Sequence, residues 1–345
     1  MTPAQRRPRL ALLPLTITII TITAIACGEP DPPPPPPEKP AWSEAFAARD
    51  LGWLLSVWGP SGSDLYAVGG APAQGVVMHF DGSAWSRRDL GLEVPLLNWV
   101  YGFASDDLSF AGARGTLLHF DGARFTRSAT ITDQDLWGVW GASPDDLWAV
   151  GGNGAAAGQA TVLRFDGARW RKVELPVLQR PNVFAFFKVW GSAHDDVYIV
   201  GQRGAVLHWN GSELGEISVG ATVDLISLWG TGRDRVAIVG GRANGELITW
   251  DGASWTRHPL APLAGLNGVW MRDPMRVHLV GEEGTIATYD WGTATYELEE
   301  APTRLSVHAI FGDSSGKLTA VGGSLLSIEP PYRGVALTRG MIDRD

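Results

Sequence analysis

The sequence is poor in cysteine, in helical periodicity and in basic charge. Its one cysteine, Cys27, cannot form a disulfide within the chain, and no cysteine-based metal site is possible. No window carries apolar residues at the sustained spacing of an amphipathic helix. The formal net charge is −9, and no basic stripe is visible. Because binding to a phosphate backbone needs such a stripe, the sequence argues against a nucleic-acid partner.

Glycine and tryptophan are abundant instead. The 345 residues include 43 glycines and 16 tryptophans, and 45% of the residues are hydrophobic. This composition is typical of many short strands that end in turns and pack large rings between them. The clearest unit is 136–171, in which four strand-like runs are separated by glycine or Asp-Gly turns. A lone four-stranded meander could not bury both of its faces, so this unit requires copies of itself.

The copies are identified by the residue that ends the first strand of each unit, after an aromatic residue. These anchors are Gly59, Gly102, Gly141, Gly191, Gly230, Met271 and Gly312. In the first five units the third strand ends in Asp-Gly or Asn-Gly, which suits a two-residue hairpin turn. Seven four-stranded units with a period near 42 residues predict an all-β fold, a seven-bladed β-propeller.

The two ends of the repeat array are expected to close the ring. The last unit lacks an Asp-Gly turn after 324–330, whereas 41–59 aligns without a gap to 84–102, with Trp42 in the place of the fourth-strand tryptophan. The N-terminal strand should therefore pair with the last blade and remove the open sheet edge. The alternative fourth strand is 334–340, which lacks the tryptophan.

The amino terminus has the pattern of a secretory signal. Three arginines precede an uncharged run, 10–26, which ends in small residues before Cys27. The run Ala-Ile-Ala-Cys at 24–27 resembles a bacterial lipobox. The resemblance implies that a signal peptide, 1–26, is removed and that Cys27 receives a lipid and anchors the protein to a membrane. An uncleaved membrane anchor is the alternative, for which the run is short.

The residue after this cysteine bears on localisation. It is Gly28 rather than aspartate. In Gram-negative families, aspartate at this position tends to retain a lipoprotein in the inner membrane. The resemblance therefore implies an exported protein that is lipid-anchored to the cell envelope, in the outer membrane if the cell is Gram-negative.

A proline-rich segment separates the cysteine from the repeats. The tether, 27–40, contains six consecutive prolines, which form neither helix nor sheet and extend as polyproline II. The predicted organisation is thus a signal peptide, this tether with its lipidated cysteine, the propeller at 41–340 and a C-terminal tail at 341–345.

The repeats resemble two known groups. A Val-Gly-Gly end to the second strand, as at 68–70, followed by an aromatic-Asp pair and then a tryptophan, is similar to kelch-type repeats. Val-Trp-Gly followed by Asp-Leu-Trp-Ala-Val-Gly resembles a set of uncharacterised bacterial repeat lipoproteins of the propeller or BNR-like kind. The resemblance implies the fold and says almost nothing about function, because propellers carry many unrelated activities.

Residue types that could carry chemistry recur at equivalent repeat positions. One position on the third strand holds His79, His119 and His208. Different blades hold such positions apart, so these histidines cannot share a metal ion. Paired aspartates such as Asp145 and Asp146 are interpreted as turn residues that cap their own backbone amides. The glycine-rich run 151–158 lacks the following helix of a dinucleotide site. We find no enzyme signature and expect neither a cofactor nor a bound metal.

The candidate binding surface lies on the side of the ring where the loops vary. Loops between second and third strands and links between blades differ in length, and the longest link is 174–187. Trp99 and Lys188 interrupt a set of mostly small residues three positions before each anchor, so we expect them at the mouth of the central channel. Local variation in packing is the alternative. The candidate partner-binding residues are Trp99, Arg180, Phe184, Phe186 and Lys188.

Three functions are compatible with these patterns. The first is a lipid-anchored, non-enzymatic propeller that binds a protein or a glycan at the cell envelope. The second is a glycan-active hydrolase or lyase whose catalytic residues lie in the variable loops. The third is an assembly or scaffold factor of the envelope. We favour the first, because a tether, a closed scaffold and one variable face occur without a recognisable catalytic motif.

Overall fold

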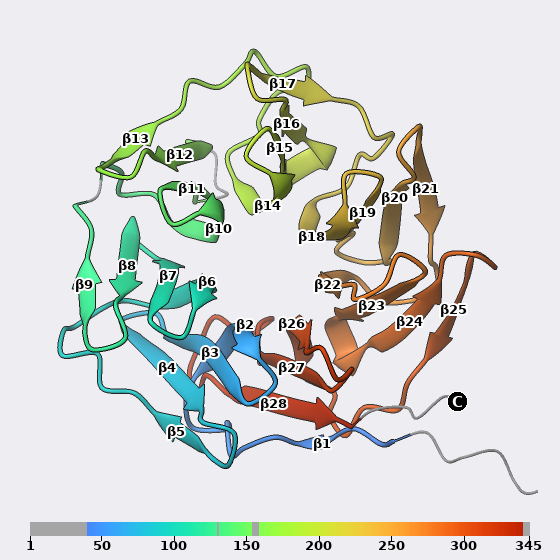
Figure 1. Cartoon of the computed structure of the whole chain (residues 1–345). Coiled ribbons are helices and arrows are strands. Elements are labelled where there is room, and N and C mark those ends of the chain that lie inside the picture. The colour runs from blue at the N-terminus through green and yellow to red at the C-terminus, as the bar shows by residue number, and fades with distance from the viewer. Residues whose placement is uncertain (1–39, 130, 154–158, 341–345) are drawn as a thin grey trace, which may run out of the picture. The chain divides into compact units, whose positions relative to one another are not determined.

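The structure, a computed structural model, describes residues 40–129, 131–153 and 159–340. The signal peptide, Cys27, nearly all of the tether, the tail 341–345 and most of the loop 151–158 lie outside the described residues. Within them, 28 strands form seven four-stranded antiparallel sheets, arranged as blades around a central axis (Figure 1). The predicted seven-bladed propeller is confirmed. None of the helical segments in the described ranges has the length and hydropathy needed to cross a membrane.

Each blade places its first strand at the axis. The innermost strands are β2 (Trp53–Ser61), β6 (Leu97–Ala104), β10 (Leu136–Ser143), β14 (Phe186–Ala193), β18 (Leu225–Gly232), β22 (Leu266–Trp270) and β26 (Ser306–Gly312). The second strands are β3 (Asp64–Ala71), β7 (Asp107–Gly112), β11 (Asp146–Gly151), β15 (Asp196–Gly201), β19 (Arg235–Gly240), β23 (Arg276–Gly281) and β27 (Leu318–Gly323).

The outer half of each blade is shorter and more exposed. The third strands are β4 (Gln74–Phe80), β8 (Thr116–Phe120), β12 (Thr161–Phe165), β16 (Val206–Trp209), β20 (Glu246–Trp250), β24 (Ile286–Asp290) and β28 (Gly334–Arg339). The fourth strands are β5 (Trp85–Arg87), β9 (Phe125–Arg127), β13 (Trp170–Lys172), β17 (Leu214–Ile217), β21 (Trp255–Pro259), β25 (Thr295–Leu298) and β1 (Ser43–Glu44). Short 3-10 turns, η1 (Gln202–Gly204) and η2 (Glu282–Gly284), follow β15 and β23.

Strands from both ends of the described chain complete the seventh blade. Its sheet order is β1–β28–β27–β26, and Ser43 pairs with Thr338 (Figure 1). The N-terminal strand therefore closes the ring, as predicted. The third strand differs from the prediction, because 334–339 takes this place and 324–330 lies in the preceding loop. Pro330 and Pro331 lack the amides that a strand ladder requires, whereas β28 pairs with β27 along its whole length.

A buried cluster around Glu299 secures this closure. The indole of Trp42, which is 6% exposed, donates to Glu299 Oε2 at 2.7 Å. Arg339 of β28 also donates to this carboxylate, and Thr288 Oγ1 donates to Oε1 at 2.8 Å. Burial alone would raise the pKa of Glu299, but the Arg339 charge and these hydrogen bonds lower it below its usual value. One carboxylate that follows β25 thus ties the first and last strands together.

The lowered pKa of Glu299 predicts that acid weakens the closure. Since the folded-state pKa lies below the unfolded value, the stabilisation is present above the usual pKa near 4.5 and is lost as the pH falls through the folded-state value. We expect the unfolding free energy of wild type to fall more steeply below pH 4.5 than that of Glu299→Gln. Urea unfolding across this pH range measures the difference. Parallel curves for the two proteins would contradict it.

The aromatic residues before the anchors form a belt at one end of the axis. They are Trp58, Tyr101, Trp140, Trp190, Trp229, Trp270 and Phe311. Ring centroids of neighbouring blades lie 5.8 Å apart for Trp58 and Tyr101, and 6.2 Å apart for Trp270 and Phe311. A Cβ added at Gly312 would lie 2.3 Å from Cη2 of Trp270. The repeated Val-Trp-Gly motif therefore reflects a tryptophan of one blade packing on the anchor glycine of the next.

Gly312→Ala should lower the unfolding free energy by about 2–3 kcal/mol, because the added methyl group overpacks the belt. The urea midpoint of the purified protein measures this loss. Gly215→Ala in β17 is the matched control, since its added Cβ would have no neighbour within 4 Å. The control should leave stability unchanged or raise it by up to about 1 kcal/mol. Equal losses in the two variants would show that the belt does not select glycine.

Candidate functional site

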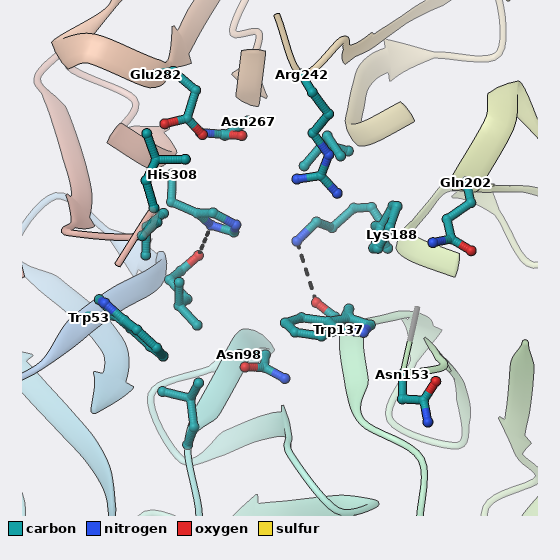
Figure 2. Close-up of a pocket in the computed structure, with 16 residues that line it drawn as sticks. Trp53, Asn98, Trp137, Asn153, Lys188, Gln202, Arg242, Asn267, Glu282 and His308 are labelled. Carbon is teal, nitrogen blue, oxygen red and sulfur yellow. Dashed lines mark hydrogen bonds between the residues drawn. The ribbon is translucent and has the colours of Figure 1, made fainter. Parts of the chain in front are cut away.

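The end of the axis where the innermost strands begin contains a cavity of about 530 Å³ (Figure 2). Residues from all seven blades line it. They lie at the start of the inner strands and in the loops that follow the second strands. This is the face on which the loops vary in length, and the aromatic belt lies at the opposite end of the same strands.

Two tryptophans of the wall are fixed by their own hydrogen bonds. The indole of Trp53 donates to the carbonyl oxygen of Ser324 at 3.1 Å. The indole of Trp137 donates to the carbonyl oxygen of Gly152 at 2.7 Å. Both bonds tie the start of an inner strand to the end of a second strand or the loop beyond it. The rings are therefore held in place before a ligand arrives, which lowers the entropy lost on binding.

Lys188 is the buried basic side chain of the cavity. It lies on β14 and is 3% exposed. Its Nζ is 3.1 Å from the ring centroid of Trp99 on β6 and donates to the carbonyl oxygen of Trp137 at 3.5 Å. In the described ranges, no carboxylate lies within 4 Å of this nitrogen. Burial lowers the pKa of the Lys188 ammonium well below its usual value, and the face of Trp99 offers a partial compensation to the charged form.

Two further basic side chains point into the same space (Figure 2). Arg242, which follows β19, is exposed and donates from Nε and Nη2 to Asp224 Oδ2, at 3.3 Å each. His308 donates from Nδ1 to the carbonyl oxygen of Leu55 at 2.7 Å. Burial, together with the charges of Lys188 and Arg242, lowers the pKa of His308 to about 3. The imidazole is therefore neutral near pH 7, and its Nε2 carries no proton.

The carboxylate of Glu282 and the amides of Asn267 and Asn98 also line the cavity. Ser306 Oγ and Asn267 Nδ2 both donate to Glu282, the amide at 2.9 Å. Asn98 Nδ2 donates to the carbonyl oxygen of Leu136 at 2.9 Å. Its buried Oδ1, by contrast, accepts no hydrogen bond from any residue in the described part of the chain. The site thus offers basic donors, and the buried Oδ1 of Asn98 as an acceptor, within a largely apolar wall.

No family model and no curated protein matches this sequence. Several solved structures share its fold. YCF48 from Cyanidioschyzon merolae is 14% identical, with a TM-score of 0.66 over 87% of this chain and 99% of its own. A YCF48 bound to D1 peptide is 14% identical, with a TM-score of 0.64 over 89% and 100%. A streptogramin B lyase is 10% identical, with a TM-score of 0.67 over 88% and 98%. At these identities the likeness shows the propeller fold alone.

The structure brings two of the five candidate binding residues together. Trp99 and Lys188 are in contact, and Lys188 lines the cavity. Phe186 is fully buried in the core, while Phe184 and Arg180 are half-buried and do not belong to the cavity wall. The part that these three play in binding stays a prediction, as does the lipidation of the cysteine outside the described residues.

A β-bulge in β14 explains why Phe187, which follows the buried Phe186, reaches the cavity. The pairing with β15 shifts between Phe186 and Lys188, which leaves Phe187 without a partner in the ladder. Phe187 and Lys188 consequently both line the cavity, although adjacent residues of a regular strand point to opposite faces. The regular alternation of side chains along a strand would therefore not predict that both residues line the cavity.

A second repeat position supplies lining residues that the anchor pattern misses. In blades three to six, the residue directly after the glycine end of the second strand lines the cavity. These residues are Asn153, Gln202, Arg242 and Glu282. Four blades carry four different polar residues at one position, and a comparison of loop starts across the repeats would have revealed this signal.

The recurrent histidines pair with recurrent aspartates at the outer part of the blades. The Nε2–Oδ1 distances are 2.7 Å for His79–Asp64, 3.0 Å for His119–Asp107 and 2.8 Å for His208–Asp196. In blade three Arg164 takes the histidine position and pairs with Asp146 at 2.8 Å. The second aspartate of each pair therefore bridges two strands, and its interpretation as a cap of its own amides is wrong. Among the described residues, no group of three or more His, Cys, Asp or Glu side chains could hold a metal ion.

Proposed function

We propose that this propeller is a non-enzymatic binding module that takes a segment of a partner protein into the axial cavity. The cavity itself carries the proposal: about 530 Å³, lined from seven blades and open on the face with variable loops. Binding pockets for organic ligands commonly have volumes of roughly 300–1,000 Å³ and mostly apolar walls with a few convergent polar groups. A YCF48 propeller of similar fold binds a D1 peptide, which supports a peptide site on such a scaffold.

Exposed apolar side chains at the mouth favour a protein over a glycan. Leu326 is 79% exposed and lines the cavity, and Ile328 is 81% exposed two residues further on. Tyr332 donates to the carbonyl oxygen of Ile328 at 3.2 Å, and its ring packs edge-on against Trp53 with centroids 4.6 Å apart. The loop is thus held beside the mouth with its apolar side chains in water. Apolar residues presented in this way are typical of protein-binding surfaces.

The wall favours binding over glycoside hydrolysis. Most glycoside hydrolases place two carboxyl groups on either side of the bond that they cleave. In the described wall Glu282 is the one carboxylate, and two protein donors already engage it. A hydrolase or lyase is therefore the second choice, and it would have to use an acid beyond this wall.

We retain the cell envelope as the proposed location of the module. The support comes from the amino-terminal sequence, where basic residues, an apolar run and Ala-Ile-Ala-Cys precede a proline-rich tether. A lipid on Cys27 would leave the propeller tethered and its cavity available to a partner in the envelope. Fatty-acid labelling that disappears in Cys27→Ser would support this location, and labelling that persists would refute it.

Capture by the full-length protein tests the binding function. We expect Leu326→Asp to weaken the interaction with a partner from envelope extracts by about ten-fold or more, since it places a charge in an apolar contact. Leu298→Asp is the matched control, because Leu298 is a 59% exposed leucine on β25 outside the cavity wall. Equal capture by both variants would exclude this mouth as the site. Turnover of an envelope polysaccharide by the wild type would overturn the non-enzymatic proposal.

A further inference from the structure

We infer that the axial cavity binds a carboxylate group of its ligand on the ammonium of Lys188, with the guanidinium of Arg242 beside it. This inference rests on the proposed function and specifies the chemistry that the partner segment contributes. A protein segment can supply this carboxylate from two groups. One is the C-terminal carboxylate, and the other is the side chain of an aspartate or glutamate.

Lys188 is buried without a counter-charge among the described residues. A compact, strongly hydrated ammonium is costly to bury unless an anion or several hydrogen bonds replace the water. The aromatic face of Trp99 and one carbonyl oxygen at 3.5 Å satisfy at most two of its three N–H groups. At least one donor therefore remains for a ligand. A bound carboxylate would supply the missing counter-charge where the described residues supply none within 4 Å.

Two basic side chains, Lys188 and Arg242, face this space. The charges of Lys188 and Arg242 both act on His308 and lower its pKa. Arg242 uses Nε and Nη2 for its long bonds to Asp224, which leaves Nη1 for a ligand. The wall contains two basic side chains, Lys188 and Arg242, against one acid, Glu282, and Asp224 beyond the wall pairs with Arg242. Glu282, the acid of the wall, is held by Ser306 and Asn267 rather than by a cation.

The apolar part of the wall limits which anion fits the cavity. The wall includes Leu55, Leu96, Ile226 and Phe187, so a ligand group loses much of its hydration on entry. That cost rises steeply with charge, and a singly charged carboxylate on an apolar stem suits one ammonium better than a doubly charged phosphate does. The unused Oδ1 of Asn98 calls for an N–H donor in the ligand. A peptide brings both groups.

Lysine-selective labelling provides a direct readout. The chain has four lysines, which are Lys39, Lys172, Lys188 and Lys317. The full chain, labelled at lysine Cε, is titrated with three pools of acetylated random peptides. The first pool ends in a free carboxylate and lacks Asp and Glu, the second is its carboxamide twin, and the third is a carboxamide pool with one internal Asp or Glu. We expect the Lys188 resonance to shift with the first or third pool and not with the second, and the pool that acts identifies the source.

Paired variants make the test decisive. Lys188→Met should weaken binding of the active acidic pool by about ten-fold or more and leave the carboxamide pool unchanged, because a charge-assisted contact is lost. Lys317→Met is the control, since Lys317 stacks 5.3 Å from the ring centroid of Phe80 and precedes β27, at the opposite end of the strands. Unfolding curves verify that both variants fold.

The outcomes separate the two proposals. An acid preference that persists in Lys188→Met, or acidic peptides that bind at the mouth without shifting the Lys188 resonance, would overturn the carboxylate inference and leave the peptide-binding function standing. If no pool binds to wild type, both proposals fall.

Discussion

Trp42→Ala should lower the unfolding free energy of the propeller by about 3–5 kcal/mol, the range for truncating a buried tryptophan. The loss has two parts. The indole fills a buried site between the ends of the ring, and its N–H satisfies a buried carboxylate that Arg339 also contacts. Removing it leaves Glu299 short of a donor and frees the short strand β1. Urea unfolding measures the loss, and faster amide exchange in β1 and β28 shows where the ring opens.

Trp85→Ala is the matched control for this closure. Trp85 occupies the equivalent position in blade one, is half-buried and packs on Phe46 at a centroid distance of 4.6 Å. It does not join the two ends of the chain, so its removal should cost less and leave exchange in β28 unchanged. Equal losses in the two variants would mean that Trp42 only fills space and does not hold the ring closed.

Lys188→Met should raise the unfolding free energy of the ligand-free protein by about 1–4 kcal/mol, because an apolar side chain of similar volume replaces a buried, incompletely paired cation. The direction is unusual, since most substitutions of buried residues destabilise. Such a rise would identify Lys188 as a residue that serves binding at a cost to stability. Urea unfolding without peptide measures the change.

Lys172→Met provides the reference for this stability change. Lys172 is exposed at the end of β13, and its substitution should alter the unfolding free energy by less than about 0.5 kcal/mol. If Lys188→Met instead destabilises the protein, Lys188 is a structural element of the inner ring. The local-packing interpretation of Lys188 and Trp99 would then replace the binding one.

Much of the fold could be predicted because repetition makes weak signals visible. One Val-Trp-Gly or Asp-Gly says little, but seven anchors with similar spacing predict seven blades. The structure adds the physical reason, which is that five of the anchor glycines lie against a ring of the preceding blade: Gly102, Gly141, Gly191, Gly230 and Gly312. The third strand of blade seven was missed because its turn lacks Asp-Gly. In addition, 324–330 carries leucine and isoleucine among polar residues, as an exposed strand would.

The site could be predicted only in part, because most of its residues occupy repeat positions other than the one, three before the anchor, at which large residues interrupt a set of small ones. Lys188 and Trp99 stood out as large residues where other blades carry small ones. Asn98, Arg242 and His308 lie on three other inner strands or loops, and only ring closure brings them to one cavity. The bulge that turns Phe187 toward the cavity depends on how β14 pairs with β15. This register could not be predicted from the sequence of β14 alone.

The central claim is that a partner segment enters the cavity at the variable face. Site-specific photo-crosslinking tests it most directly, with a benzophenone amino acid at Leu326 beside the cavity or at Met275 between β22 and β23 on the opposite face. Both side chains are exposed, at 79% and 44%. We expect position 326 to crosslink a partner peptide, the acidic peptide pool to compete with this crosslink, and position 275 to yield none. Crosslinks from position 275 alone, or crosslinks at 326 that the acidic pool leaves intact, would contradict this claim.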